Sequence, residues 1–233
     1  MTKRGSAGGR PRESGMVTSE PRVGILTAAA SLFAEKGFAS TRMAEIAQAA
    51  GLKQSSIYYW FNSKDAILRA IMDQNRTSLI AARTLADRPE SAAVRLYIVL
   101  YRDVIQMCSA PLNFYDLEEA ATKQPEVFRD FHEDYHELVR LLQLIIDDGL
   151  ATGVFCAEPA SDFVRTALSL TEGSQHRFHV DGRKESDIDR FADSAARLAV
   201  RAIVEDPDTM DHVRREAQHG IAGFRACPDP EDQ

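Results

Sequence analysis

The sequence has 233 residues, of which 44% are hydrophobic and 27% are charged, as in globular proteins with a sizeable core. No apolar run approaches the roughly 18 residues that a membrane span needs, and the N-terminus lacks the hydrophobic segment of a signal peptide. The net charge of −7 is unevenly divided, because residues 1–64 carry +5 and residues 65–233 carry −12. A basic N-terminal part joined to an acidic remainder favours nucleic-acid binding at the basic end.

Cysteine usage agrees with a cytoplasmic location. Cys108, Cys156 and Cys227 are odd in number, widely separated and not arranged as a CxxC pair. This pattern fits a reducing compartment and argues against a disulfide framework or a zinc site.

Both ends of the chain are expected to be disordered. Residues 1–21 are rich in Gly, Ser and Arg and have no apolar periodicity, so they are predicted to form a basic arm. Such an arm either follows DNA beside a DNA-binding domain or is an untethered tail, and the sequence leaves both alternatives open. Residues 226–233 are predicted to be a second disordered segment.

Three short helices are predicted next, over about 22–36, 42–50 and 54–61, because apolar residues recur at helical spacing in each. Thr41 is expected to be the N-cap of the second helix. Gly51 follows that helix at the point where the chain must turn with a positive φ. The second and third helices therefore form a helix-turn-helix.

The third of these helices has two different faces. Ile57 and Phe61, at i and i+4, are expected to face inward. The other faces carry Gln54, Ser55, Ser56, Tyr58, Tyr59 and Trp60. The major groove of DNA offers base edges to Gln and Ser, thymine methyl groups to aromatic rings, and phosphates to hydroxyls. Asn62 and Ser63 predict the N-cap of a fourth helix, whose N-terminus and Lys64 are suited to a phosphate.

This stretch resembles the DNA-binding signature of the TetR family of bacterial transcriptional regulators, over about residues 22–75. The matching residues are Thr41, Ile46, Ala47, Ala50, Gly51, Leu52, Ile57, Tyr58, Phe61, Ser63 and Lys64. The family often has a small hydroxyl residue at the start of the second helix and Gly or Pro two places later, where this chain has Lys53 and Ser55. Lys53 has no acceptor with which to cap a helix, so Ser55 or water is expected to take that role. The base preference is therefore expected to differ from that of better-known relatives.

The predicted DNA contacts divide into two groups. Base edges are assigned to Gln54, Ser56 and Tyr59, with Ser55 beside them on the same surface. Phosphates are assigned to Thr41, Arg42, Lys53, Tyr58 and Lys64. The resemblance implies a homodimer, which also makes physical sense, because two recognition helices related by a two-fold axis read both halves of a palindromic operator.

A long helix is predicted from Lys64 to about Arg83, leading from the DNA-binding head into the rest of the chain. The predicted boundary between a head at 22–70 and a body at 71–225 lies within this helix. The body is predicted to be helical throughout, near 91–108, 113–121, 125–148, 161–179, 187–205 and 208–223, with Pro and Gly between the helices. The fold class is therefore all-α, with a three-helix head and a larger effector-binding and dimerisation body.

Two clusters in the body suggest a pocket for a small-molecule effector. The residues assigned to it are Met107, Phe114, Phe131, His132, Tyr135, Glu172, Gln175 and His176. An ordinary core uses the same residue types, so this alternative stays open. His132 with His136, and His176 with His179, have the spacing of metal-ligand pairs, but no third ligand lies at a recognisable spacing. No metal or cofactor is predicted.

An alanine-rich stripe on the helix near 187–205 is the candidate dimer interface. Its residues are Ile188, Phe191, Ala195, Leu198, Ala199 and Ala202. Small residues allow helices to approach closely, and the alternative is burial of the stripe within one subunit. The sequence has no catalytic constellation, so it predicts a ligand-responsive transcriptional regulator, most often a repressor in families of this kind, rather than an enzyme. The rival interpretations are a helical enzyme with an incidental helix-turn-helix and an architectural DNA-binding protein.

Overall fold

The computed structural model describes residues 21–73, 76–110, 114–123, 125–126, 128–156, 160–182 and 184–219. Of the segments predicted to be disordered, 226–233 and all of 1–21 except Pro21, which begins the first helix, lie outside these ranges. Within them the chain is helical, and the extended pairing is limited to an isolated bridge between Phe155 and Val204. The α-helices are α1 (Pro21–Lys36), α2 (Met43–Ala49), α3 (Gln54–Trp60), α4 (Lys64–Met72), α5 (Thr77–Leu85), α6 (Ala92–Ser109), α7 (Phe114–Lys123), α8 (Arg129–Ala151), α9 (Ala160–Val180), α10 (Ile188–Arg201) and α11 (Met210–Gln218).

The all-α prediction is confirmed, and most predicted helices agree with the observed bounds to within a few residues. Short 3₁₀ turns, Glu185–Asp187 and Pro207–Thr209, precede α10 and α11. None of the described helices combines the length and the apolarity that a bilayer crossing requires.

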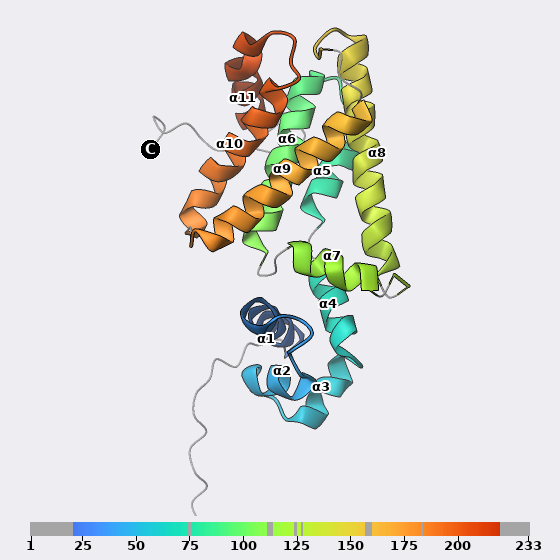
Figure 1. Cartoon of the computed structure of the whole chain (residues 1–233), viewed down its shortest axis with the longest axis vertical. Coiled ribbons are helices and arrows are strands. Elements are labelled where there is room, and N and C mark those ends of the chain that lie inside the picture. Colours follow the sequence, from blue (N-terminus) through green and yellow to red (C-terminus); the bar gives the residue numbers. More distant parts are fainter. Residues whose placement is uncertain are drawn as a thin grey trace, which may run out of the picture.

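Helices α1 to α4 form a small head at one end of the molecule, and α3 lies at its tip (Figure 1). The apolar residues whose spacing predicted these helices meet in one core, which includes Ile25, Ile46, Ile57 and Ile67 with no exposed surface. Local periodicity therefore explains the head, because each helix contributes one apolar stripe to a shared interior.

The head core also contains two residues from far along the chain. Ala121, near the end of α7, and Phe128, just before α8, are buried in the same cluster as the residues of α1 to α4. Helix α7 lies between the head and the rest of the body in Figure 1. The packing of the head therefore depends on the α7–α8 corner as well as on its own helices.

The prediction of one continuous helix from Lys64 to Arg83 was wrong, because α4 ends at Met72 and α5 begins at Thr77. Arg76, the N-cap of α5, has the non-helical backbone angles φ −118° and ψ 18°. The intervening sequence begins Asp-Gln-Asn, in which Asp and Asn are weak helix formers. No apolar residue lies between Met72 and Leu79 to hold that turn against a core.

Helix α6 is the centre of the body. It is buried over most of its circumference and packs against α5, α8, α9, α10 and α11. Its run of apolar residues therefore marks an interior helix rather than an amphipathic surface helix.

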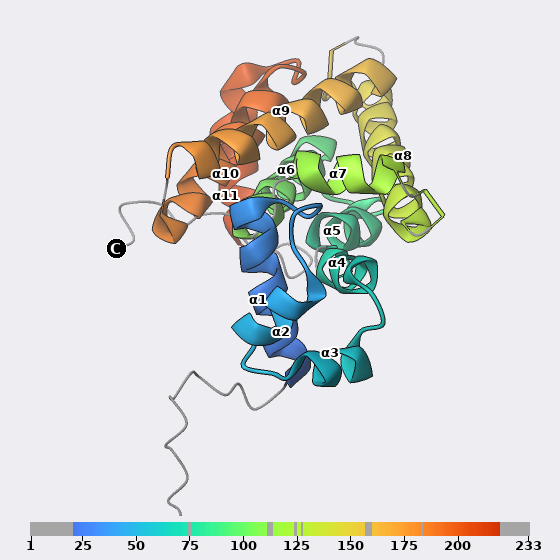
Figure 2. The same ribbon diagram turned by 60° about the horizontal axis from the view of Figure 1, so that its bottom comes forward.

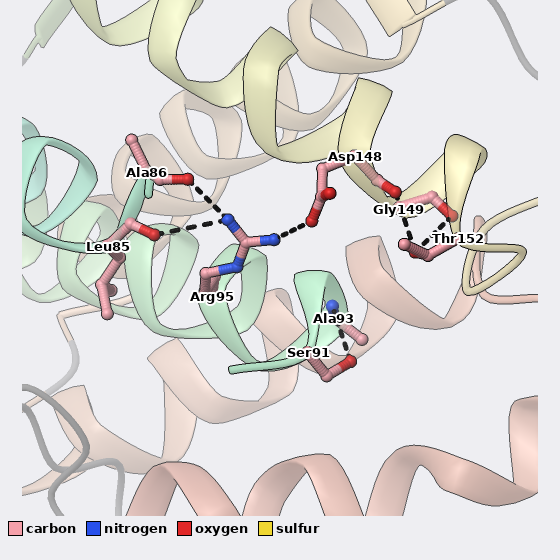
Figure 3. Close-up of polar contacts among 8 residues, drawn as sticks. All are labelled: Leu85, Ala86, Ser91, Ala93, Arg95, Asp148, Gly149 and Thr152. Atoms are coloured by element: carbon pink, nitrogen blue, oxygen red, sulfur yellow. Dashed lines mark hydrogen bonds and ion pairs between the residues drawn. The ribbon is translucent and has the colours of Figure 1, made fainter. Parts of the chain in front are cut away.

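A buried arginine on α6 joins the ends of two neighbouring helices (Figure 3). The Arg95 Nη1 donates a 2.6 Å hydrogen bond to the carbonyl of Ala86, just beyond the end of α5, and Nη2 pairs with the Asp148 carboxylate on α8. Because the last carbonyls of a helix lack partners within the helix, Arg95 provides one for the end of α5.

The alanine stripe of α10 packs inside the chain, mainly against α6. Ile188, Ala195 and Ala199 are buried in the body core, and Phe191 is partly buried against Phe178 with ring centroids 5.7 Å apart. Packing within one subunit therefore accounts for the burial of Ile188, Ala195 and Ala199, while the assignment of the stripe to a subunit interface stays a prediction. The small side chains explain the close packing of α10 on α6. Leu198 differs, since it is 61% exposed, and Ala202 is also exposed.

Candidate nucleic-acid interface and ligand cavity

The turn between α2 and α3 has the geometry of a helix-turn-helix. Gly51 adopts φ +70°, the left-handed region that favours glycine. The Leu52 N–H donates to the carbonyl of Ala47 at 2.8 Å, and Leu52 packs against the head core. The predicted turn at Gly51 is confirmed.

The predicted N-cap at Thr41 was wrong, because α2 begins one residue later with Arg42 as its N-cap. The Glu45 carboxylate accepts the Arg42 backbone N–H at 2.8 Å and the Lys36 ammonium at 2.7 Å. Thr41 is only 2% exposed, and its hydroxyl donates inside the protein to the carbonyl of Gly37 at 2.9 Å. In this arrangement the Thr41 hydroxyl is not offered to a DNA phosphate.

Lys64 also points into the protein. Its ammonium donates to the carbonyls of Phe38 at 2.5 Å, Thr41 at 2.9 Å and Ala39 at 3.2 Å, and it lies 4.4 Å from the centroid of the Phe38 ring. A lysine ammonium has three N–H donors, so these carbonyls use all of them. Burial lowers the pKa of Lys64, and Asp65 opposes that effect. Lys64 thus fixes the loop between α1 and α2 rather than projecting toward DNA.

The outer face of α3 is exposed and largely aromatic. Tyr59 is 83% exposed, Tyr58 and Trp60 are also exposed, and the Tyr59 and Trp60 rings meet edge to face with centroids 5.2 Å apart. Ile57 and Phe61 are buried as predicted. The three rings therefore face away from the core. Helix α3 lies at the far end of the head from the body (Figure 2).

The polar residues assigned to DNA lie around these rings. Gln54 and Ser55 are exposed and Ser56 is half-buried, all in the first turns of α3. Arg42 and Lys53 are exposed at the N-caps of α2 and α3. Trp60 shares this surface although sequence reasoning gave it no contact. The sequence feature that could have indicated a DNA contact for Trp60 is its position next to two tyrosines on a short helix.

A cavity of about 100 Å³ lies where the head meets the body. Its wall comes from α4, α5, α6, α7, α8 and α9 and from the segments around them. The lining residues are Arg69, Met72, Asp73, Arg76, Ser78, Leu79, Asp103, Gln106, Met107, Ala110, Phe114, Phe128, Asp130, Phe131, Asp134, Tyr135, Leu138, Leu168 and Gln175.

The cavity brings together five of the eight residues predicted for an effector pocket: Met107, Phe114, Phe131, Tyr135 and Gln175. The other three lie outside its wall. His132 Nε2 is 3.3 Å from the carbonyl of Ala121, His176 is an exposed residue whose ring meets the edge of Tyr115, and Glu172 is half-buried nearby.

Of the two predicted histidine pairs, the side chain of His179 lies outside the described residues. His136 is exposed on α8. Within the described residues, no three His, Cys, Asp or Glu side chains converge as a metal site would require.

Asp103 is the most buried acid of the cavity wall, and sequence reasoning missed it. It is 1% exposed, and its carboxyl accepts a 2.8 Å hydrogen bond from the Thr171 hydroxyl. Burial raises the pKa of Asp103, while hydrogen bonds from Thr171 and Ser78 oppose the rise. A charged residue within the apolar sequence of α6 was the signal that would have identified it.

Further acids surround this end of the cavity. Burial raises the pKa of Glu172 to about 7, and the negative charges of Asp103 and Glu118 add to the rise. Burial also raises the pKa of Tyr135, again with contributions from these carboxylates. The folded chain therefore favours the protonated form of Glu172 more than the unfolded chain does.

Ion pairs connect the junction between α4 and α5 to α8. Arg76, at the start of α5, lies 2.6 Å from Asp134, and Arg83 lies 2.5 Å from Glu137. Both pairs are partly exposed, so each contributes little to stability by itself. Their positions nevertheless link the segment next to the head with the long helix that forms one wall of the cavity.

Comparisons with known proteins agree with these observations. Residues 25–71 match the family model described as bacterial regulatory proteins, tetR family. The HTH-type transcriptional repressor KstR2 of Rhodococcus jostii is 29% identical over 140 residues, which cover 58% of this chain and 67% of that protein. Two other curated regulators are matched over only 30% and 42% of their own length.

Solved structures extend the similarity beyond the head. AmtR of Mycobacterium smegmatis has 25% sequence identity and a TM-score of 0.68, covering 94% of this chain and all of that one. AibR, solved with isovaleryl coenzyme A and operator DNA, has 20% identity and a TM-score of 0.64, with coverage of 77% and 97%. At this identity the AibR match shows a shared fold.

Proposed function

Since the chain is a member of the TetR family of bacterial regulatory proteins, we propose that it is a sequence-specific transcriptional repressor, released from a palindromic operator by a small-molecule effector. The observation that carries this proposal is the outer face of α3. Its exposed aromatic rings and polar side chains stand at the tip of a head whose net charge is positive. A protein surface of this kind matches the size and chemistry of the DNA major groove.

The contacts divide as the exposed geometry suggests. Gln54, Ser56 and Tyr59 read base edges and methyl groups. Arg42, Lys53 and Tyr58 bind phosphates, while Ser55 lies beside the residues that read bases. Thr41 and Lys64 are left out of this set, because their polar atoms bond to backbone carbonyls of the head.

A homodimer provides the second recognition helix. Two copies of α3 about 34–36 Å apart would enter successive major grooves on one face of the duplex. Leu198 on α10 and Ala202 just after its end are exposed, and they are the exposed members of the predicted stripe that we assign to the interface. KstR2 is named as a repressor and AibR was solved on operator DNA, which supports the same role here.

The position of the cavity supports control by an effector. Arg69, Met72, Asp73 and Arg76 line it, and they belong to α4 or to the segment between α4 and α5. An occupant therefore touches the part of the chain that holds the head on the body. It would release DNA if it binds the DNA-free conformation more tightly than the DNA-bound one.

The test is fluorescence anisotropy of the purified protein on duplexes tiled across the DNA upstream of its own gene, at about 150 mM salt, where weak non-specific binding is suppressed. We expect binding confined to a palindromic tile, with two subunits per site. The control is the Tyr59→Ala variant, which keeps the charge of the head and should lose the preference for that tile. Weak binding to every tile that vanishes with added salt would contradict sequence-specific recognition.

A further inference from the structure

The buried part of the cavity wall between head and body is rich in apolar side chains. They include Met72, Leu79, Met107, Phe128, Leu138 and Leu168. The half-buried rings of Phe114 and Phe131 stand beside them, with centroids 6.2 Å apart. Such a surface gains free energy when an apolar group covers it and displaces water.

Two glutamines of the wall already use their amide oxygens within the protein. Gln106 Oε1 accepts the backbone N–H of Ser78, and Gln175 Oε1 accepts that of Phe114, both at 3.1 Å. Gln175 makes a further interaction as well. Each glutamine thus fixes a piece of backbone at the cavity wall, and its oxygen does not depend on a ligand for a hydrogen bond.

The buried acid of the wall is also hydrogen-bonded inside the protein. The carboxyl of Asp103 accepts a 2.8 Å bond from the Thr171 hydroxyl and a second bond from Ser78. Burial raises the pKa of Asp103, which favours the uncharged acid, while these two bonds oppose the rise. A ligand cation is therefore not needed to balance this side chain.

The other charged side chains of the wall are exposed or paired. Arg69, Asp73 and Asp130 are exposed, so they mark the side on which the cavity meets solvent. Arg76 is paired with Asp134 at 2.6 Å. Among the described residues of the wall, none of the fully buried polar side-chain atoms lacks a hydrogen-bond partner. The interior therefore presents apolar surface and satisfied polar groups.

We propose that this cavity binds an uncharged, apolar molecule of about one ring and selects against both cations and anions. An ion placed there would lose hydration without gaining a counter-charge, whereas an apolar molecule has no such cost. The volume of about 100 Å³ sets the size, because an engineered apolar cavity of about 150 Å³ stays dry and binds benzene. The claim that this molecule is the effector rests on the proposed function; the claim that it binds does not.

The experiment compares three probes that share a phenyl ring and differ in charge: toluene, benzylamine and benzoate. Isothermal titration calorimetry on the purified full chain, without DNA, measures the affinity for each at pH 7.5, where benzylamine is a cation and benzoate an anion. Salt at about 150 mM screens the exposed charges at the mouth of the cavity. Toluene should bind at least about tenfold more tightly than either ion. Equal affinities, tighter binding of either ion, or no binding of toluene up to its solubility would overturn the proposal.

Adding a charge to the wall tests the reason for this selection. Gln106→Glu keeps the shape of the side chain, and one carboxylate oxygen can still accept the Ser78 N–H while the other faces the cavity. The affinity for benzylamine relative to toluene should therefore rise at least about tenfold. Gln143→Glu is the matched control, since Gln143 is half-buried on α8 outside the cavity wall, and it should leave the preference for toluene unchanged. An unchanged preference in Gln106→Glu would overturn this account of the selection.

Filling the cavity locates the bound molecule. Met107→Trp should abolish toluene binding, because Met107 lies buried in the wall and the indole is larger. Ile80→Trp adds the same group on the exposed side of α5, outside the wall, and should leave toluene binding unchanged. Full toluene binding by Met107→Trp would place the ligand elsewhere and overturn the assignment to this cavity.

Circular dichroism shows whether each variant is folded. If the wall variants do not fold, the comparison of the three probes on the unmodified chain still decides for or against an uncharged ligand. If toluene binds and operator affinity is unchanged, the ligand assignment stands and release of DNA by this class of molecule is refuted. If the chain binds no operator at all, the proposed function fails while the calorimetric result still holds.

Discussion

Replacing Lys64 with methionine distinguishes a structural lysine from a DNA-binding one. Methionine keeps an unbranched apolar stem and removes the ammonium, which donates to the carbonyls of Phe38, Ala39 and Thr41 in the structure. If these bonds are its role, the variant should lose stability, because the α1–α2 loop loses the group that holds it against the start of α4.

The expected loss follows from the three bonds and their costs. A hydrogen bond to a charged group contributes about 1.5–3 kcal/mol, and the ammonium over the Phe38 ring adds about 0.5–1 kcal/mol. Three effects oppose this contribution. Ordering a lysine side chain costs about 1.5–2 kcal/mol, and the ammonium loses part of its hydration in the folded chain. In the variant, water can also replace the ammonium at the exposed carbonyls. Because the three carbonyls share one partly exposed ammonium, their contributions do not add, and the expected net loss is that of about one such bond, about 2 kcal/mol, which lowers Tm by about 4–8 °C in a chain of this size.

The assay pairs thermal unfolding with DNA binding over a series of salt concentrations. Lys53→Met is the matched control, because Lys53 is exposed at the N-cap of α3. It should melt like the unmodified chain and reduce the slope of log affinity against log salt by about 1.8, because a dimer loses two phosphate contacts worth about 0.9 each. If Lys64→Met melts normally and shows that reduced slope instead, the reasoning from its carbonyl contacts is refuted.

The remaining predictions concern recognition, a buried ion pair and pH. Tyr59→Ala should flatten the preference among operator sequences by about 1–3 kcal/mol at the affected base pairs in competition binding, whereas equal loss on every sequence would assign Tyr59 to the backbone. Asp148→Asn should lower the free energy of unfolding in urea by about 1–2 kcal/mol, because it leaves the buried Arg95 without its carboxylate; the loss is modest because Asp148 itself is 50% exposed. For the control Asp147→Asn, the free energy of unfolding should change by less than about 0.5 kcal/mol. The raised pKa of Glu172, about 7, means that the folded chain binds this proton more tightly than the unfolded chain, so stability falls as pH rises from about 4.5 to 7. Glu172→Gln should therefore be more stable than the unmodified chain by about 1–2 kcal/mol at pH 8, after allowance for partial exposure, and as stable as the unmodified chain at pH 4. If the variant and the unmodified chain are equally stable at pH 8 as well as at pH 4, the burial of this carboxyl is contradicted.

The sequence predicts the head well because the head is built from local patterns. One apolar stripe per helix and a glycine with positive φ at Gly51 specify three helices and their turn. The roles of Thr41 and Lys64 depend instead on backbone carbonyls brought near them by folding. No spacing in the sequence records such partners, so exposed and buried polar side chains looked alike.

The body shows where periodicity stops being informative. An apolar stripe indicates that one face of a helix is buried, but it does not identify the element that buries it. The alanines of α10 were therefore as compatible with a partner subunit as with α6, against which they pack. The cavity wall comes from six helices, and no sequence spacing relates its most buried acid, Asp103 on α6, to Tyr135 on α8 or Gln175 on α9. The break after Met72 was missed for another reason: apolar residues on either side of it continue the helical spacing, while the weak helix formers between them end the helix.

Because Ala121 and Phe128 are buried in the core of the head, the head cannot simply be separated from the rest of the chain. Regulators of this architecture invite chimeras in which the DNA-reading end of one chain is fused to the sensing end of another. A fusion made anywhere between α4 and α5 would separate the head from two residues that complete its interior. A working hybrid must therefore include the α7–α8 corner or redesign the head surface that this corner covers. The fusion point between α4 and α5, which looks natural along the sequence, does not separate two independent cores.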